Sequence, residues 1–258
     1  MRAIIQSKNA GSHIFKIALL SSVLGVAFSA SSDALASTSS LYDLRENRVL
    51  RQWKEGAQDT TNGKKLLSLL ESCNRKIKHN STDKKSLYLR GYLYGTIGCT
   101  TSAIHDLSEA VRIDPYYSAA YTERGICYLD SHLYDRALDD LNRALQLDSW
   151  SADAHLARAR LLILMNRSRE AERDLKACEG AAYKFRPALP GELSGDYYKA
   201  SHYYLGKVYE SQGRRFDALR EYRKYNQSSG KVSYGYLHRY SDKPLDTKTR
   251  VKKLGYKL

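Results

Sequence analysis

The sequence lacks the short motifs that mark the common classes of enzyme. Its 258 residues contain no His-Glu-x-x-His, no Gly-x-Ser-x-Gly, no phosphate-binding loop and no Gly-x-Gly-x-x-Gly. These patterns carry the zinc ligands of metalloproteases, the nucleophile of serine hydrolases and the phosphate cradle of nucleotide-binding enzymes. An active site assembled from distant residues would leave no such motif, but nothing in the sequence points to one. We therefore expect no catalytic residues, no cofactor and no enzymatic activity.

Long apolar runs are also missing, with one short exception near the N-terminus. Residues 17–28 are largely apolar, follow basic residues at 2, 8 and 16, and precede Ala34-Leu35-Ala36. The run is shorter than the roughly 20 residues of a membrane-spanning helix, and its flanks are typical of a secretory signal peptide. We predict a signal peptide over 1–36, cleaved near Ala36, and a periplasmic or secreted mature protein; a retained anchor is the alternative. No cysteine directly follows the run, so no lipid-modified cysteine is predicted.

Cysteine is scarce and widely spaced. Cys73, Cys99, Cys127 and Cys178 lie 26, 28 and 51 residues apart, whereas zinc sites use closely spaced pairs. We therefore predict no metal site. The even count would permit disulfides in an exported protein, but three of the thiols fall on positions expected to be packed. Only Cys99, at a turn, is expected to be accessible, and we favour no disulfide over one.

Acidic residues are fewer than basic ones. The chain has 42 Lys and Arg against 28 Asp and Glu, and half of the excess that remains after residue 36 lies in 231–258. Such a segment is either a solvated tail or a contact site for an anionic surface. Export argues against nucleic acid as the partner and leaves an anionic envelope polymer or membrane surface.

What the sequence does contain is an internal repeat. When it is shifted against itself by 34 residues, the same residue types coincide at many positions. The coincidences are Gly91 with Gly125, Tyr94 with Tyr128, Ala103 with Ala137 and Ala171, Leu107 with Leu141 and Leu175, Arg90 with Arg124 and Arg158, and Asp106 with Asp140 and Asp174. So many matches at one offset predict an array of similar units.

Each unit is predicted to be a pair of helices. Apolar and small residues recur at helical spacing in two runs, which in the first unit cover about 86–98 and 101–113. Gly91 and Ala103 stand where the two helices must approach closely, and Leu107 fills the space beside them. Pro115 then ends the second helix. One hairpin cannot cover its own apolar face, so neighbouring hairpins must stack.

These units resemble the tetratricopeptide repeat (TPR) family, whose 34-residue signature places aromatic, glycine, alanine and proline residues at fixed offsets. The resemblance is carried by Gly91, Tyr94, Ala103, Leu107, Ala110 and Pro115 in residues 84–117, and by Tyr121, Gly125, Tyr128, Ala137, Leu141 and Ala144 in residues 118–151. The third unit, 152–180, is degenerate, because His155 takes the aromatic position and Cys178 replaces an alanine. The resemblance implies an all-α fold, a right-handed α-solenoid of TPR helical hairpins.

The remaining segments are assigned from the same pattern. The period breaks over 181–196, which we interpret as an inserted linker, and resumes in a fourth hairpin over 197–226, where Ala218 lies 47 residues after Ala171. Residues 42–80 are predicted to form a divergent N-terminal hairpin, and 227–258 a basic, tyrosine-rich C-terminal segment. His155 and His202 fall on the aromatic packing position, so both are expected to be structural.

The TPR resemblance also implies where a ligand binds. In the family, residues at fixed positions of the first helices line a concave groove. The corresponding residues are Lys85, Tyr88, Tyr92, Thr122, Ile126, Leu129, Leu156, Arg160, Ile163, Tyr203 and Lys207. This apolar and aromatic surface with a few cations suits a peptide. The alternative is that its isoleucines and leucines only cover the next hairpin.

One TPR subgroup grips the C-terminal carboxylate of cytosolic chaperones through lysine, asparagine and arginine in the groove. This sequence departs from that pattern at each position, with Tyr88 and Tyr92, then Glu123, then Asp153 and Ala157. A co-chaperone role is therefore not expected.

The leading functional hypothesis is an exported interaction module or assembly scaffold that binds a peptide or protein partner in its concave groove and folds as a monomer. The alternative is an envelope-associated protein that holds an anionic polymer or membrane surface through the basic C-terminal segment. A non-catalytic accessory to an envelope enzyme is a third hypothesis, which only its partner would distinguish from the first.

Overall fold

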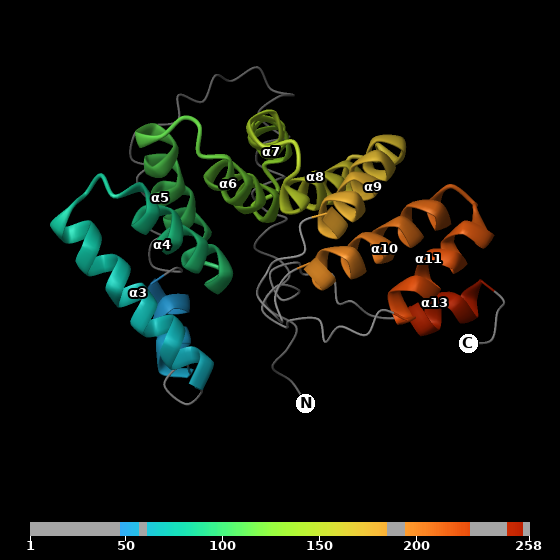
Figure 1. The fold of residues 1–258 in the computed structure, drawn as a ribbon. Coiled ribbons are helices and arrows are strands. Elements are labelled where there is room, and N and C mark those ends of the chain that lie inside the picture. The colour runs from blue at the N-terminus through green and yellow to red at the C-terminus, as the bar shows by residue number, and fades with distance from the viewer. Residues whose placement is uncertain (1–46, 57–60, 185–193, 228–246, 255–258) are drawn as a thin grey trace, which may run out of the picture. The chain divides into compact units, whose positions relative to one another are not determined.

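The computed structural model describes residues 47–56, 61–184, 194–227 and 247–254. The chain splits into two compact units, 1–45 and 46–258, and the predicted signal peptide lies outside the described residues. The second unit is built from helices, with no strand in the ranges described, which confirms the all-α fold (Figure 1). Residues 47–56 are helical, and the helices that follow are α3 (Thr61–His79), α4 (Lys84–Ile97), α5 (Thr100–Ile113), α6 (Ser118–Asp130), α7 (Tyr134–Leu147), α8 (Ala152–Leu164), α9 (Ser168–Lys184), α10 (Ser194–Ser211), α11 (Arg215–Gln227) and α13 (Thr247–Lys253).

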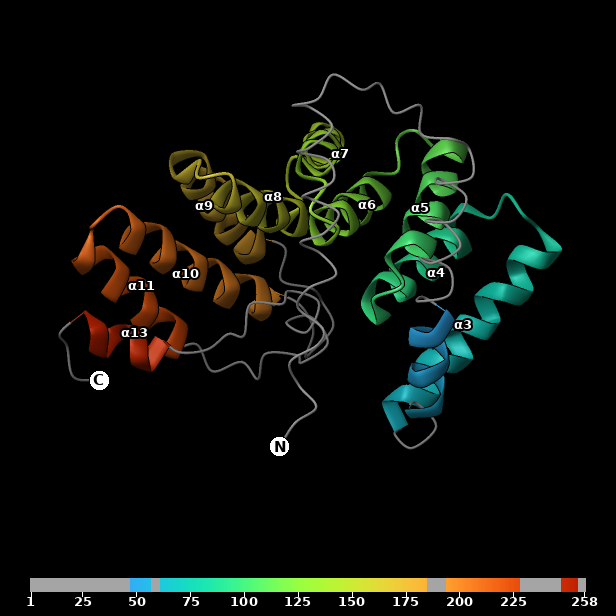
Figure 2. The same cartoon turned by 180° about the vertical axis from the view of Figure 1, so that it is seen from behind.

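The helices pack as successive hairpins, α4 with α5, α6 with α7, α8 with α9, and α10 with α11. Each hairpin also packs against the next, so that α10 lies between α9 and α11 in both views (Figures 1 and 2). Residues 185–193, within the predicted linker, lie outside the described residues. Helix α9 continues to Lys184 and α10 begins at Ser194, so both ends of that predicted linker are helical.

Close helix contacts within the hairpins depend on glycine. A Cβ atom on Gly91 would lie 2.8 Å from Leu107 Cγ, and one on Gly125 would lie 2.9 Å from Leu141 Cγ. The predicted close approach at Gly91 is thus confirmed. In the last hairpin Gly206 faces the ring of Tyr222, where the other hairpins have leucine.

The turn inside each hairpin contains one residue with a left-handed backbone. These residues are Gly98 (φ 92°), His132 (φ 59°), Asn166 (φ 62°) and Gly213 (φ 73°), which occupy equivalent positions of successive hairpins. Glycine adopts this conformation without steric cost, and asparagine tolerates it better than most residues. The turns therefore have one geometry despite different sequences.

The described part of the C-terminal segment is not a solvated tail. Helix α13 packs against α11, and Val251 is fully buried in the same core cluster as Tyr222. Arg250 Nη1 donates a hydrogen bond to Glu210 Oε2 at 2.7 Å. One of the eight basic residues of 231–258 is thus used in an internal ion pair.

The prediction that Cys99 is accessible was wrong. Cys99 immediately precedes α5, but its side chain turns inward and only 1% of the residue is exposed. All four cysteines are buried free thiols, and burial raises the pKa of Cys73 and Cys178.

Candidate functional site

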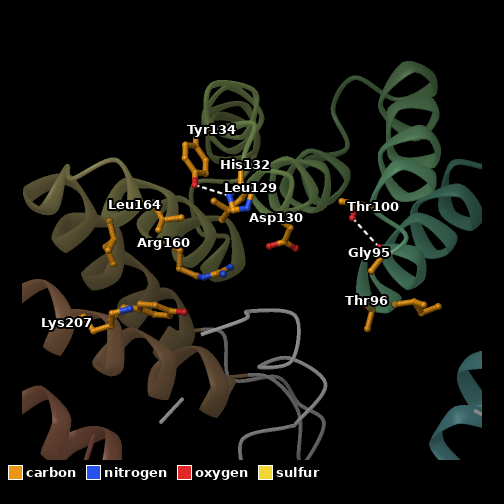
Figure 3. A pocket seen from close by; sticks show the side chains of 14 residues that line it. Gly95, Thr96, Thr100, Leu129, Asp130, His132, Tyr134, Arg160, Leu164 and Lys207 are labelled. Atoms are coloured by element: carbon orange, nitrogen blue, oxygen red, sulfur yellow. Dashed lines mark hydrogen bonds between the residues drawn. The ribbon is translucent and has the colours of Figure 1, made fainter. Parts of the chain in front are cut away.

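A cavity of about 560 Å³ lies on the surface formed by the first helices of the hairpins (Figure 3). Its wall combines residues of α4, α6, α8 and α10 with residues of the turns that follow α4 and α6. The lining residues are Gly95, Thr96, Ile97, Gly98, Thr100, Leu129, Asp130, His132, Tyr134, Arg160, Ile163, Leu164, Tyr204 and Lys207. Stacking of four hairpins thus creates a hollow that no single hairpin contains.

Two cations line this cavity from adjacent hairpins. Arg160 and Lys207 occupy the same position of their hairpins, because the offset of 47 residues that relates Ala171 to Ala218 also relates Arg160 to Lys207. Figure 3 shows their side chains extending from α8 and α10 into the same space, with Asp130 of α6 on another part of the wall. The wall therefore carries two cationic side chains and one carboxylate.

Tyrosine rings hold the ammonium group of Lys207. Its Nζ lies 5.7 Å from the ring centroid of Tyr203 and 5.6 Å from that of Tyr204, within the range of cation–π attraction. Tyr203 and Tyr204 are themselves buried in the core. The position of this charge is thus set by a rigid support.

Helix ends reach the cavity without leaving their final carbonyls open. The amides of Gly98 and Cys99 donate to Gly95 and Tyr94 at the end of α4. Equivalent turn amides donate to the carbonyls of Cys127, Tyr128 and Leu129 after α6, and of Leu161, Leu162 and Ile163 after α8. Because these acceptors are already used, the two cations are not required to satisfy them.

The rest of the wall is partly apolar. Leu129 is buried, Ile97 and Ile163 are half-buried, and Leu164 is 60% exposed at the edge. An exposed leucine alone needs no explanation, but this one adjoins the two cations in the same hollow. The arrangement can therefore hold a group that has both an anionic and an apolar part.

The structure brings together only some of the predicted groove residues. Four of them line the cavity, namely Leu129, Arg160, Ile163 and Lys207. Tyr203 supports Lys207 from within the core, while Lys85 is exposed elsewhere on α4.

Three predicted groove residues are corrected because they are interior. Thr122, Ile126 and Leu156 are at most 2% exposed. Ile126 packs in one cluster with residues of α8, and the Thr122 hydroxyl donates to the Ser118 carbonyl. These side chains cover the neighbouring hairpin, which was the alternative weighed for the apolar positions.

Tyr88 and Tyr92 are half-buried on α4 and do not line the cavity. The ring of Tyr88 lies 5.1 Å from that of Tyr117 and belongs to the core cluster around Leu107. Burial, reinforced by the nearby Glu123 carboxylate, raises the pKa of Tyr88. Tyr88 therefore has a packing role.

Sequence reasoning missed the last residue of each first helix and the turn behind it. Leu164 lies four residues after Arg160, on the same helix face, and Thr96 and Asp130 occupy the equivalent positions of their repeats. Helical spacing could have identified them. The turn residue His132, whose Nδ1 hydrogen-bonds the Tyr134 hydroxyl at 3.1 Å, gave no such signal.

Two absences limit the chemistry of the part of the chain that the structure describes. Within it, no three His, Cys, Asp or Glu side chains gather closely enough to hold a metal ion. No helix in the same ranges has the length and apolar composition needed to cross a membrane.

Comparison with known proteins gives the fold a family context. No family model matches the chain. It is 32% identical over 98 residues to a protein of Haemophilus influenzae named lipoprotein NlpI homolog, a match that covers 38% of this chain but only 31% of that protein's length.

Solved structures of TPR proteins are similar over most of the chain. The thermophilic TPR protein TTC0263 of Thermus thermophilus matches with a TM-score of 0.53 and 20% identity, covering 81% of this chain and 98% of that one. MamA matches with a TM-score of 0.51 and 21% identity over 62% and 85%. YrrB, described as a TPR protein with an unusual peptide-binding site, matches with a TM-score of 0.51 and 15% identity over 72% and 93%. At these identities the similarity establishes the α-solenoid of TPR hairpins.

Proposed function

We propose that this TPR protein is a non-catalytic interaction scaffold that binds a peptide or protein segment in the cavity between α4, α6, α8 and α10. The observation that carries the proposal is the cavity wall, which draws on all four hairpins and combines fixed cations with apolar side chains. Such a surface suits a chain that crosses several helices. The peptide-binding site named for the similar fold of YrrB supports the same choice.

A non-catalytic role agrees with the accessibility of the best acid–base pair. His202 Nδ1 lies 2.7 Å from Glu221 Oε2, but His202 is 0% exposed. His155 is likewise held by Asp174 at 3.1 Å and sits on the aromatic packing position. Both histidines join helices of one hairpin, and a substrate would not reach the first.

An envelope location is part of the proposal. The predicted signal peptide over 1–36 favours export, and the name of the Haemophilus influenzae relative is that of a lipoprotein. Because no cysteine directly follows the apolar run, we propose a periplasmic or secreted protein without a lipid anchor.

Site-specific photo-crosslinking tests the binding surface. A photoreactive amino acid replaces Leu164 or Thr96 in the cavity wall, and Tyr116 or Phe216, both 76% exposed, in the matched controls. After irradiation of cells that express the full chain, the same partner should be captured from both cavity positions and from neither control. Equal capture from the control positions would contradict binding in the cavity.

A second candidate function uses the basic C-terminal segment to hold an anionic polymer or membrane surface. The docking of α13 through buried Val251 favours it, because docking fixes the exposed Lys252 on the protein surface. Contacts between exposed charges weaken as ionic strength rises. Binding to anionic vesicles that survives physiological salt would argue against this candidate.

A further inference from the structure

We infer that Arg160 and Lys207 together bind a carboxylate of the partner, and that Ile163 and Leu164 take an apolar side chain next to it. This inference rests on the proposed function and specifies the class of ligand. The partner is an acidic peptide segment whose carboxylate is flanked by apolar residues.

The first support is the placement of charge. Two cations from adjacent hairpins extend into one hollow (Figure 3), and bringing like charges into a partly enclosed space is unfavourable unless an anion neutralises them. The carbonyls at the nearby helix ends are already hydrogen-bonded to turn amides. An anionic ligand is the natural complement to this wall.

The second support concerns the kind of anion. A guanidinium group offers a planar pair of donors that matches a carboxylate, and the ammonium of Lys207 is held in place by Tyr203 and Tyr204. Asp130 lines the same cavity, so a dianion such as a phosphate ester would meet stronger repulsion than a carboxylate. A single negative charge suits two cations and one carboxylate best.

The third support is the apolar neighbour. Leu164 follows Arg160 by one helical turn and is 60% exposed, so a ligand side chain beside the bound carboxylate would cover it. Buried apolar contact supplies affinity, while the charged contact supplies orientation. The ligand therefore needs both groups close together.

Selection from a random heptapeptide library displayed with free C-termini tests the inference on the full chain. We expect enrichment of peptides with an acidic residue, or the terminal carboxylate, beside leucine, isoleucine or phenylalanine. Synthetic copies of the enriched peptides with free and amidated C-termini then distinguish a terminal carboxylate from a side-chain carboxylate.

Variants connect the selection to the two cations. Arg160→Gln and Lys207→Gln should each weaken the enriched peptides about tenfold, as the loss of one charge-assisted hydrogen bond does. Arg169→Gln, an exposed arginine on α9 outside the cavity, should have no effect. Thermal melting verifies folding, and Lys207, which is only half-buried, provides the readout if Arg160→Gln melts early.

The outcomes separate the two proposals. Enriched peptides without a carboxylate, or acidic peptides that bind both variants as tightly as the parent, would overturn the carboxylate site while leaving peptide binding intact. If no peptide is retained and crosslinking from position 164 captures nothing, the proposed function itself fails.

Discussion

Arg124 of α6 and Asp140 of α7 face each other through two hydrogen bonds, Nε to Oδ2 at 2.7 Å and Nη2 to Oδ1 at 2.8 Å. The third donor, Nη1, reaches back to Ser108 Oγ of the preceding hairpin at 3.1 Å. The same arrangement recurs as Arg90 with Asp106 and Asn74, and as Arg158 with Asp174 and Asn142. Each arginine thus joins its own hairpin to the one before it.

Arg124→Leu should destabilise the fold by about 3 kcal/mol, because it leaves the buried Asp140 carboxylate without its partner. Urea unfolding measures the change. The matched control is Arg112→Leu, which breaks the exposed pair with Glu109 and should change the free energy of unfolding by less than about 0.5 kcal/mol. Equal effects in the two variants would show that the repeated arginine is no more than a surface residue.

The intra-hairpin turns predict opposite effects for two glycines. Gly98 has φ 92°, so Gly98→Ala should cost about 1 kcal/mol even though no atom lies within 4 Å of the added Cβ. Gly180 lies within α9 in open space, so Gly180→Ala should stabilise by about 0.5–1 kcal/mol through helix propensity. Both changes are measured by thermal unfolding, and a stabilising Gly98→Ala would refute the left-handed turn.

Glu221 predicts an acid-sensitive contribution to stability. Burial alone would raise the pKa of Glu221, but hydrogen bonds from His202 and Arg220 outweigh it and lower the pKa to about 2. The folded pKa is below the unfolded value of about 4.3, so ionised Glu221 stabilises the fold above that value. This stabilisation is lost as the pH falls from about 5 to 2.

Glu221→Gln should therefore lower stability at pH 7 by an amount on the order of 2 kcal/mol and flatten the loss of stability between pH 5 and 2. Chemical denaturation at a series of pH values follows both effects. Glu109→Gln, on the exposed part of α5, should keep the slope of the parent. An unchanged slope in Glu221→Gln would contradict the hydrogen bond with His202.

The repeat pattern identified the hairpins because packing fixes it. Gly91 and Leu107 recur at one offset because no larger pair fits between two helices that approach so closely. The site was harder to predict, because a first helix presents neighbouring positions to both the concave surface and the next hairpin. Ile126 faces the next hairpin and Arg160 lines the cavity, although both occupy the same repeat position. Only the packed structure separates them.

The C-terminal helix should contribute to stability through one residue. Val251 is 0% exposed, so Val251→Ala should cost about 1.5–2 kcal/mol for the apolar groups that lose their buried contacts. Lys252→Gln, at the exposed neighbouring position, should leave the melting temperature unchanged. Equal melting of the two variants would show that α13 does not dock in solution, and deletion of 231–258 would then test charge alone.

The last prediction separates packing from binding on neighbouring first helices. Tyr88 packs against Tyr117 in the core cluster of Leu107, so Tyr88→Ala should lower the free energy of unfolding by roughly 2–3 kcal/mol. Leu164 is 60% exposed in the cavity wall, so Leu164→Ala should change stability by less than about 0.5 kcal/mol. A ligand that covers Leu164 would nevertheless lose roughly 1–2 kcal/mol of binding free energy in that variant, which titration with an enriched peptide measures. Leu164→Ala that binds like the parent, together with weakened binding by a folded Tyr88→Ala, would move the site from the cavity to the α4 surface.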